Sequence, residues 1–172
     1  MAIKIEPRAG QHDRTGFSCG EPELDDYFRR RSGQDERRNV ARVFVASDDV
    51  LGVVGFYTLS TCSIHPGELP NEITRKLPRY DTIPAALIGR LARNLRARGR
   101  GIGELLLADA IKRVLAADRS MAVWAILVDA KNQAATDFYK HFGFVPFPSR
   151  PTRLFLGCSF PPQRRKAASA GR

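Results

Sequence analysis

Hydrophobic and β-branched residues gather in two runs near the middle of the chain, at positions 42–47 and 50–60. The acidic pair Asp48-Asp49 separates the two runs. β-rich runs on either side of a short polar turn are typical of a β-hairpin. We therefore expect this pair to form the antiparallel part of a sheet.

Residues 21–31 follow a different period, in which Leu24, Tyr27 and Phe28 have the spacing of one helical face. Acidic side chains precede basic ones in this segment, which is the order that a helix dipole favours. The pattern predicts an amphipathic helix.

The second half of the chain alternates between strand-like and helix-like patterns. In chain order these predict a loop or short helix at 65–78, a strand at 84–92, a glycine-rich turn, a helix at 104–116, a buried strand at 121–128, a helix at 131–141, and closing strands at 144–146 and 152–156. The helix at 104–116 has Leu107, Ile111 and either Val114 or Leu115 on one face. Strand, turn, helix and strand form a βαβ unit.

The predicted elements indicate an α/β (α+β) protein with a central, mixed but mostly antiparallel sheet, flanking helices and a single domain. A chain of 172 residues with 43% apolar residues can bury one core without metals or disulfides. We assign residues 1–160 to the domain. Residues 161–172, rich in Pro, Arg, Ala and Ser, form a basic tail that we expect to be disordered.

The three cysteines, Cys19, Cys62 and Cys158, lie far apart, and none belongs to a C-x-x-C or Cys/His cluster. This spacing favours neither a disulfide framework nor a zinc site, so we expect no metal and a reducing, cytoplasmic compartment. The first residues lack the apolar stretch of a signal peptide, and the longest apolar stretch, at 50–57, is too short to span a bilayer. We expect a soluble protein without a membrane partner.

The chain is strongly basic, with 28 Lys and Arg against 18 Asp and Glu and a formal charge of +10. Such an excess favours a polyanionic partner, although a well-solvated basic surface without any such partner would have the same composition.

Gly99, Gly101 and Gly103 follow a predicted strand and precede a helix. A phosphate at such a turn needs several backbone N–H donors aimed at one point, and glycines let the backbone approach closely while the helix adds its positive end. Glycines also shape turns for structural reasons alone, so the spacing needs support from its context.

Two motifs supply that context. Arg98-x-x-Gly101-x-Gly103 resembles the R/Q-x-x-G-x-G/A signature of GNAT acetyltransferases, and residues 132–144 resemble the family's N-x-x-A-x-x-F-Y-x-x-x-G-F segment. The resemblance implies the GNAT fold and acetyl-CoA as cosubstrate. It also implies that Tyr139 faces the CoA sulfur, where a phenol can donate to a leaving thiolate while staying neutral at pH 7. As a core aromatic, Tyr139 would stand at the same place in the pattern.

The same resemblance implies a set of cofactor-binding residues. The strand end at 91–93 would pair with the pantetheine arm, the turn at 98–103 would bind pyrophosphate, and two residues of the second motif would close the site. The full set is Leu91, Ala92, Arg93, Arg98, Gly99, Arg100, Gly101, Ile102, Gly103, Asn132 and Phe138.

A narrower resemblance covers nearly the whole chain. Phe17-x-Cys19-Gly20-x-x-x-Leu24, the block at 55–60 and the block at 88–92 are similar to segments of GNAT toxins from type II toxin–antitoxin pairs. The resemblance implies that the acceptor is the α-amino group of aminoacyl-tRNA, whose acetylation blocks translation. It implies a ribbon-helix-helix antitoxin as the partner protein, and a homodimer is a natural way to widen the RNA-binding surface.

A row of basic residues around the predicted cofactor cleft agrees with an RNA acceptor. The candidates for tRNA binding are Arg75, Lys76, Arg79, Arg90, Arg93 and Arg96. Some arginines here must serve the phosphates of CoA instead, so the cluster alone does not separate the two ligands.

No general base stands beside Tyr139 in the sequence. An α-amino group, with a reference pKa of ~7.7–8.0, needs less help than a lysine near ~10.4. His65, Glu68 and His141 are candidates for assisting proton removal, but a lone histidine in a loop is typical of solvated surface. We assign no base.

Two other functions fit the same motifs. One is a GNAT that acetylates a small amine or a protein N-terminus, for which the fold, the turn and Tyr139 would be unchanged. The other is a basic RNA-binding module that keeps the scaffold without catalysis, which the charge of +10 would also suit.

Overall fold

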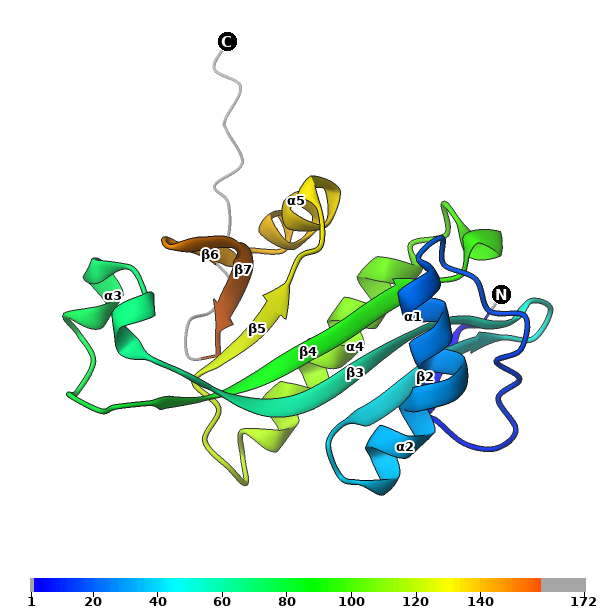
Figure 1. Cartoon of the computed structure of the whole chain (residues 1–172), viewed down its shortest axis with the longest axis horizontal. Helices are drawn as coiled ribbons and strands as arrows, with labels where there is room; N and C mark the ends of the chain where they lie inside the picture. Colours follow the sequence, from blue (N-terminus) through cyan, green and yellow to red (C-terminus); the bar gives the residue numbers. More distant parts are fainter. Residues whose placement is uncertain (1, 159–172) are drawn as a thin grey trace, which may run out of the picture.

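Seven strands form one sheet in the order β1-β2-β3-β4-β5-β7-β6 in a computed structural model that describes residues 2–158 (Figure 1). Every neighbouring pair is antiparallel except β4 and β5, which are parallel. The strands are β1 (Lys4–Pro7), β2 (Arg42–Asp48), β3 (Gly52–Ile64), β4 (Ile83–Arg93), β5 (Ala125–Asp129), β6 (Val145–Phe147) and β7 (Arg150–Gly157). The expected mixed, mostly antiparallel sheet is confirmed.

Helices cover both faces of the sheet (Figure 1). They are α1 (Pro22–Asp26), the π-helical turn η1 (Tyr27–Arg31), α2 (Ser32–Arg37), α3 (Asn71–Thr74), α4 (Ile102–Ala117) and α5 (Gln133–His141), with short 3-10 turns η2 (Pro66–Glu68) and η3 (Leu95–Ala97). α4 packs its buried face on Tyr57 and Ile88, whereas Tyr27 and Phe28 pack on Phe56 from the other face. The βαβ unit β4-α4-β5 is confirmed.

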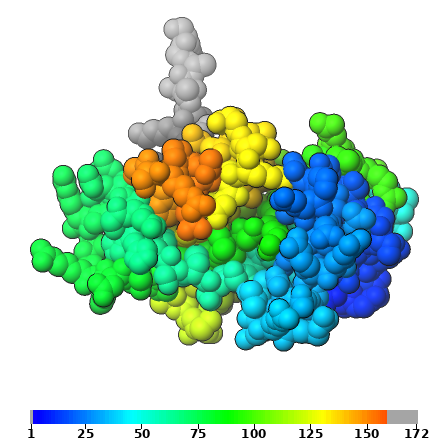
Figure 2. Space-filling model, viewed as in Figure 1, coloured from blue at the N-terminus to red at the C-terminus, as the bar shows by residue number. Residues whose placement is uncertain are grey.

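Apolar side chains on this second face form two separate clusters. One surrounds Phe56 beneath α1 to α2, and the other surrounds Ile64 and Phe155, with Ile73 of α3 packed against it. In the space-filling view, the green surface of β4 is visible between the blue of α1 and the yellow and orange of α5 and β7 (Figure 2). The middle of β4 is therefore accessible between the two clusters.

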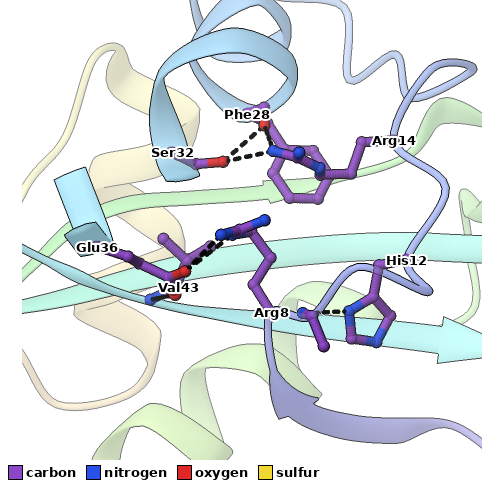
Figure 3. Close-up of polar contacts among 8 residues, drawn as sticks. Arg8, His12, Arg14, Phe28, Ser32, Glu36 and Val43 are labelled. Atoms are coloured by element: carbon purple, nitrogen blue, oxygen red, sulfur yellow. Dashed lines mark hydrogen bonds and ion pairs between the residues drawn. The ribbon is translucent and has the colours of Figure 1, made fainter. Parts of the chain in front are cut away.

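A network of charged side chains binds the N-terminal segment to this helical unit (Figure 3). Arg8 donates to the Glu36 carboxylate at 2.9 Å, and Glu36 also accepts the backbone N–H of Val43 at 3.0 Å. Arg14 donates to the carbonyl of Phe28 at 2.7 Å and to Ser32 Oγ at 2.9 Å. The network fixes the π-helical turn against β2.

The hairpin of β2 and β3 and the helical segment at 21–31 are confirmed, but several details differ from the sequence-based expectation. The strand predicted at 121–128 begins only at Ala125, because the backbone N–H groups of Met121 and Val123 bond back to the end of α4, to the Ala117 carbonyl and the Asp118 carboxylate. Val114 is buried in α4, while Leu115 is 43% exposed. The pattern did not predict β1 or the π-helical turn. The expected tail at 161–172 lies outside the described residues.

Candidate active site

β4 and β5 separate after four paired residues and leave a gap in the sheet (Figure 1). Their pairing ends at Ile88↔Val128, yet β4 continues to Arg93 with β3 as its neighbour. Within residues 2–158, no strand pairs with the β5-facing edge of β4 beyond Ile88. This edge offers backbone N–H and C=O groups to an extended ligand, as the expected pantetheine pairing at Leu91, Ala92 and Arg93 requires.

A bulge in β4 helps to open the gap. Tyr57 pairs with Leu91 and Leu59 pairs with Ile88, so that Gly89 and Arg90 together face Thr58. Thr58 Oγ1 accepts the backbone N–H of Arg90 at 3.1 Å. Bulges of this kind bend a strand and re-aim its side chains. Thr58 was not predicted as a site residue, because no sequence pattern marks a shift of register.

The glycine-rich turn lies directly after this strand and opens α4. Gly99 and Gly101 have φ of +78° and +70°, in the left-handed region that favours glycine. The first hydrogen bond of the helix runs from Leu105 N to the Gly101 carbonyl, so the N–H groups of 102–104 have no partner within the helix. With the positive end of the helix dipole, these groups suit the pyrophosphate of CoA.

The second motif packs against this turn. Asn132 caps α5 by accepting the N–H of Ala135 at 2.8 Å, which fixes where the helix begins. The ring of Phe138 lies 3.6 Å from the point that a Cβ on Gly103 would occupy. The two motifs thus form one site, in which Asn132 acts as a helix cap.

Tyr139 is 7% exposed in α5, and its ring packs against that of Phe144 with centroids 5.5 Å apart. Burial raises the pKa of the Tyr139 phenol to about 12, and the negative charge of Asp129 adds to the rise. The hydroxyl therefore keeps its proton throughout the neutral range. Tyr139 can act as a donor, and it cannot serve as a base at pH 7.

Asp129 is the last residue of β5 and lies beside the gap. It was not predicted as a site residue, although the sequence has this acidic residue directly after a run of apolar residues. Its carboxylate accepts two hydrogen bonds from the Arg153 guanidinium, at 2.9 and 3.0 Å. This pairing holds the pKa of Asp129 below its usual value. A carboxylate so stabilised is a poor proton acceptor. The other candidates for the base, His65, Glu68 and His141, are all exposed, so the structure adds no support for any of them.

The cysteines are not activated as nucleophiles. Burial raises the pKa of Cys19 to about 11, and it also raises the pKa values of Cys62 and Cys158. Thiols rather than thiolates prevail at neutral pH, which disfavours an acetyl-cysteine intermediate. Among residues 2–158, no group of three or more His, Cys, Asp and Glu side chains is placed to bind a metal.

The expected tRNA-binding residues fall into two groups rather than one row. Arg90 and Arg93 lie in the last four residues of β4, and Arg96 follows in η3, shortly before the glycine-rich turn. Arg75, Lys76 and Arg79 lie between the end of α3 and the start of β4. The expectation that all six gather around the cofactor cleft is corrected here, because Arg75, Lys76 and Arg79 precede the extended strand β4 whereas Arg90, Arg93 and Arg96 lie in its last residues or beyond them.

Arg90 has a further contact that the sequence did not predict. Its guanidinium carbon lies 3.5 Å from the ring centroid of Tyr27, in the π-helical turn. At the start of α1, Glu21 reaches Lys131 across the gap, with 3.8 Å between their charged atoms. Both contacts bring the helical unit of α1 and η1 beside the open edge of β4.

Comparison with known proteins identifies this arrangement. Residues 39–146 match the family described as acetyltransferase (GNAT) domain. The chain belongs to the GNAT acetyltransferase family. It is therefore an N-acetyltransferase that uses acetyl-CoA, and the gap and glycine-rich turn are the features that fit this cosubstrate.

Two curated relatives of this GNAT chain are toxins. A tRNA-acetylating toxin of Mycobacterium tuberculosis is 42% identical over 144 residues, which cover 84% of this chain and 85% of that protein. A probable toxin TacT of Sinorhizobium fredii is 34% identical, with 88% and 89% covered.

Two solved structures resemble the GNAT fold of this chain over most of its length. AtaT complexed with acetyl-methionyl-tRNAfMet has a TM-score of 0.84 at 28% identity and covers 91% of this chain and 95% of its own. A mutant AtaT bound to the C-terminus of the antitoxin AtaR and to acetyl-CoA has a TM-score of 0.75 at 25% identity, with 91% and 93% covered. Within the described residues, no helix of this GNAT chain has the length and apolarity to cross a membrane.

Proposed function

We propose that this chain transfers the acetyl group of acetyl-CoA to the α-amino group of aminoacyl-tRNA, and that it thereby blocks translation as the toxin of a type II toxin–antitoxin pair. The 42% identity to the tRNA-acetylating toxin, over most of both chains, carries the choice of acceptor. The GNAT fold alone would suit other amines. The basic groups along β4 support an RNA acceptor, and the cytoplasm is where charged tRNA is found.

In this proposal the open edge of β4 holds and polarises the thioester. Acetyl-CoA supplies an activated acetyl group when bound. Backbone N–H groups between Leu91 and Arg93 face the gap and can donate to the thioester carbonyl, where negative charge develops during attack. Turn residues 98–103 hold the pyrophosphate at the start of α4. Pre-oriented donors of this kind lower the barrier without rearranging during the reaction.

The chemical step is a direct attack. The α-amine forms the new N–C bond, the C–S bond breaks, and the electron pair leaves on sulfur. Tyr139 is the proposed general acid and donates from its hydroxyl to the departing thiolate. Because the pKa of about 12 lies above that of a thiol near ~8.5, hydrogen-bond donation rather than complete proton transfer is its main contribution. Water accepts the proton of the amine.

Acceptor scope is the experiment that tests this function. Purified protein with acetyl-CoA should acetylate charged tRNA and leave free polyamines, aminoglycosides and peptides nearly unmodified. Robust turnover of those small amines, with none of charged tRNA, would make the chain a GNAT of different substrate class.

The proposed partner is an antitoxin of the ribbon-helix-helix type, and the proposed active form is a homodimer. AtaT has been solved with the C-terminus of its antitoxin AtaR, which supports a protein partner for this similar chain. Co-expression with its antitoxin should relieve the growth arrest that blocked translation causes. Sedimentation should show twice the 19.1 kDa mass of one chain.

A further inference from the structure

Arg90 and Tyr27 form a stacked pair at the edge of the site. The Arg90 guanidinium carbon lies over the Tyr27 ring, 3.5 Å from its centroid, which is a close cation–π contact. The Tyr27 ring is buried, with Phe56 stacked beyond it at 6.4 Å. Arg90 is half-exposed, so it forms the outermost layer of this stack.

Hydrogen bonds on both sides fix the orientation of the pair. The backbone N–H of Arg90 donates to Thr58 Oγ1 at the bulge, and the Tyr27 hydroxyl donates to Asp35 Oδ2 at 2.8 Å. The π-helical turn that carries Tyr27 is itself anchored by Arg14, which donates to the Phe28 carbonyl (Figure 3). Such π-helical turns are frequent at functional sites. These hydrogen bonds hold the Tyr27 ring and the backbone of Arg90 in place, and so fix where the Arg90 guanidinium lies.

The stack lies on the face of the sheet from which an acceptor can approach. Ala92, two residues beyond Arg90, packs in the cluster beneath α1, while Leu91 packs on the opposite face with α4. Side chains alternate along a strand, so Arg90 points to the α1 face, directly beside the open backbone of 91–93. β4 is accessible on this face between α1 and β7 (Figure 2).

We propose that Arg90 stacks an unpaired nucleobase of the single-stranded 3′ end of the charged tRNA, and so places the esterified amino acid at the gap. This inference rests on the proposed function. Unpaired bases stack on aromatic rings and guanidinium planes with little regard to base identity. Arg31, whose guanidinium carbon lies 5.8 Å from the Tyr27 ring, adds positive charge for the adjoining phosphate.

The test measures stacking without chemistry. RNA hairpins with an unpaired 3′ end carry 2-aminopurine at each unpaired position in turn, because stacking quenches the fluorescence of this base. Wild-type protein should quench at least one position. Arg90→Lys keeps the charge but removes the plane, so it should lose that quenching and bind the hairpin about tenfold more weakly. Arg37→Lys, at an exposed arginine of α2, is the matched control and should behave as wild type.

Two checks separate the possible failures. Arg90→Lys should keep the unfolding midpoint and the acetyl-CoA affinity of wild type, which a purely structural role of the stack would lower. If Arg90→Lys quenches and binds as wild type does, the stacking inference is overturned. If wild type acetylates no charged tRNA, the proposed function fails, whatever the quenching result.

Discussion

Gly103 and Phe138 lie in contact although they belong to different helices, since a Cβ on Gly103 would stand 3.6 Å from two atoms of the Phe138 ring. This contact joins the glycine-rich turn to the helix that carries Tyr139. The turn that would hold the pyrophosphate and the helix that carries Tyr139 therefore pack against each other.

Alanine substitutions at Gly101 and Gly103 should have different effects on the free energy of unfolding. Gly101 has φ of +70°, where a Cβ is strained, so Gly101→Ala should lower the free energy of unfolding by about 1–2 kcal/mol. Gly103 has ordinary helical geometry and room for a methyl group, so Gly103→Ala should leave it unchanged or raise it by up to ~1 kcal/mol. Urea denaturation measures both. Equal losses for the two variants would contradict this reading of the turn.

Glu36 should be important for stability because it joins Arg8 to the backbone of β2. Glu36→Gln removes the charge that the Arg8 guanidinium binds at 2.8 Å, in a site where both side chains are less than 20% exposed. We expect a loss of about 1–3 kcal/mol in unfolding free energy. Glu72→Gln, at an exposed carboxylate of α3, is the control and should change it by less than about 0.5 kcal/mol. An equal effect of the two substitutions would count against the network.

The Asp129–Arg153 pair should make stability depend on pH in the acid range. The folded pKa of Asp129 lies below its unfolded value near 3.8, so the pair stabilises the fold above that value and ceases to do so as pH falls through the folded pKa. Arg153→Gln should therefore destabilise the protein at pH 6 and differ less from wild type at pH 3. A difference that is constant from pH 6 to pH 3 would show that the pair contributes no linkage.

The activity profile should show the amine and not the tyrosine. The rate should rise with pH while the α-amino group, near or below ~7.7–8.0, loses its proton. No fall should follow up to pH 9, because the pKa of Tyr139 is about 12. Initial rates corrected for ester hydrolysis measure the profile. A decline between pH 7 and 9 in the wild type would indicate a different acid.

The parts of the fold that could be predicted are those with a clear local pattern in the sequence. The hairpin of β2 and β3 and the unit β4-α4-β5 follow from alternation, turn residues and helical spacing, and they were predicted. β1 has only four residues and no distinct pattern. The π-helical turn keeps Tyr27 and Phe28 at a spacing that an α-helix shares, so a helix was predicted without its irregularity.

The parts of the candidate site that contain family motifs could be predicted from the sequence, whereas the parts that depend on tertiary packing could not. Family motifs marked the glycine-rich turn and Tyr139. The bulge opposite Thr58 is a property of strand register, and the Arg90–Tyr27 stack depends on how α1 packs across the sheet. The separation of Arg79 from Arg96 likewise follows from the extended course of β4, which charge counting does not reveal.

The most direct test of the account is transfer of labelled acetyl-CoA to a pool of charged tRNA by wild type and Tyr139→Phe, with acetyl-CoA affinity measured alongside. We expect label on aminoacyl-tRNA with the wild type, a rate at least about a hundredfold lower with Tyr139→Phe, and similar acetyl-CoA affinity for both. Absence of label on charged tRNA, from a wild-type protein that binds acetyl-CoA, would contradict the proposed function.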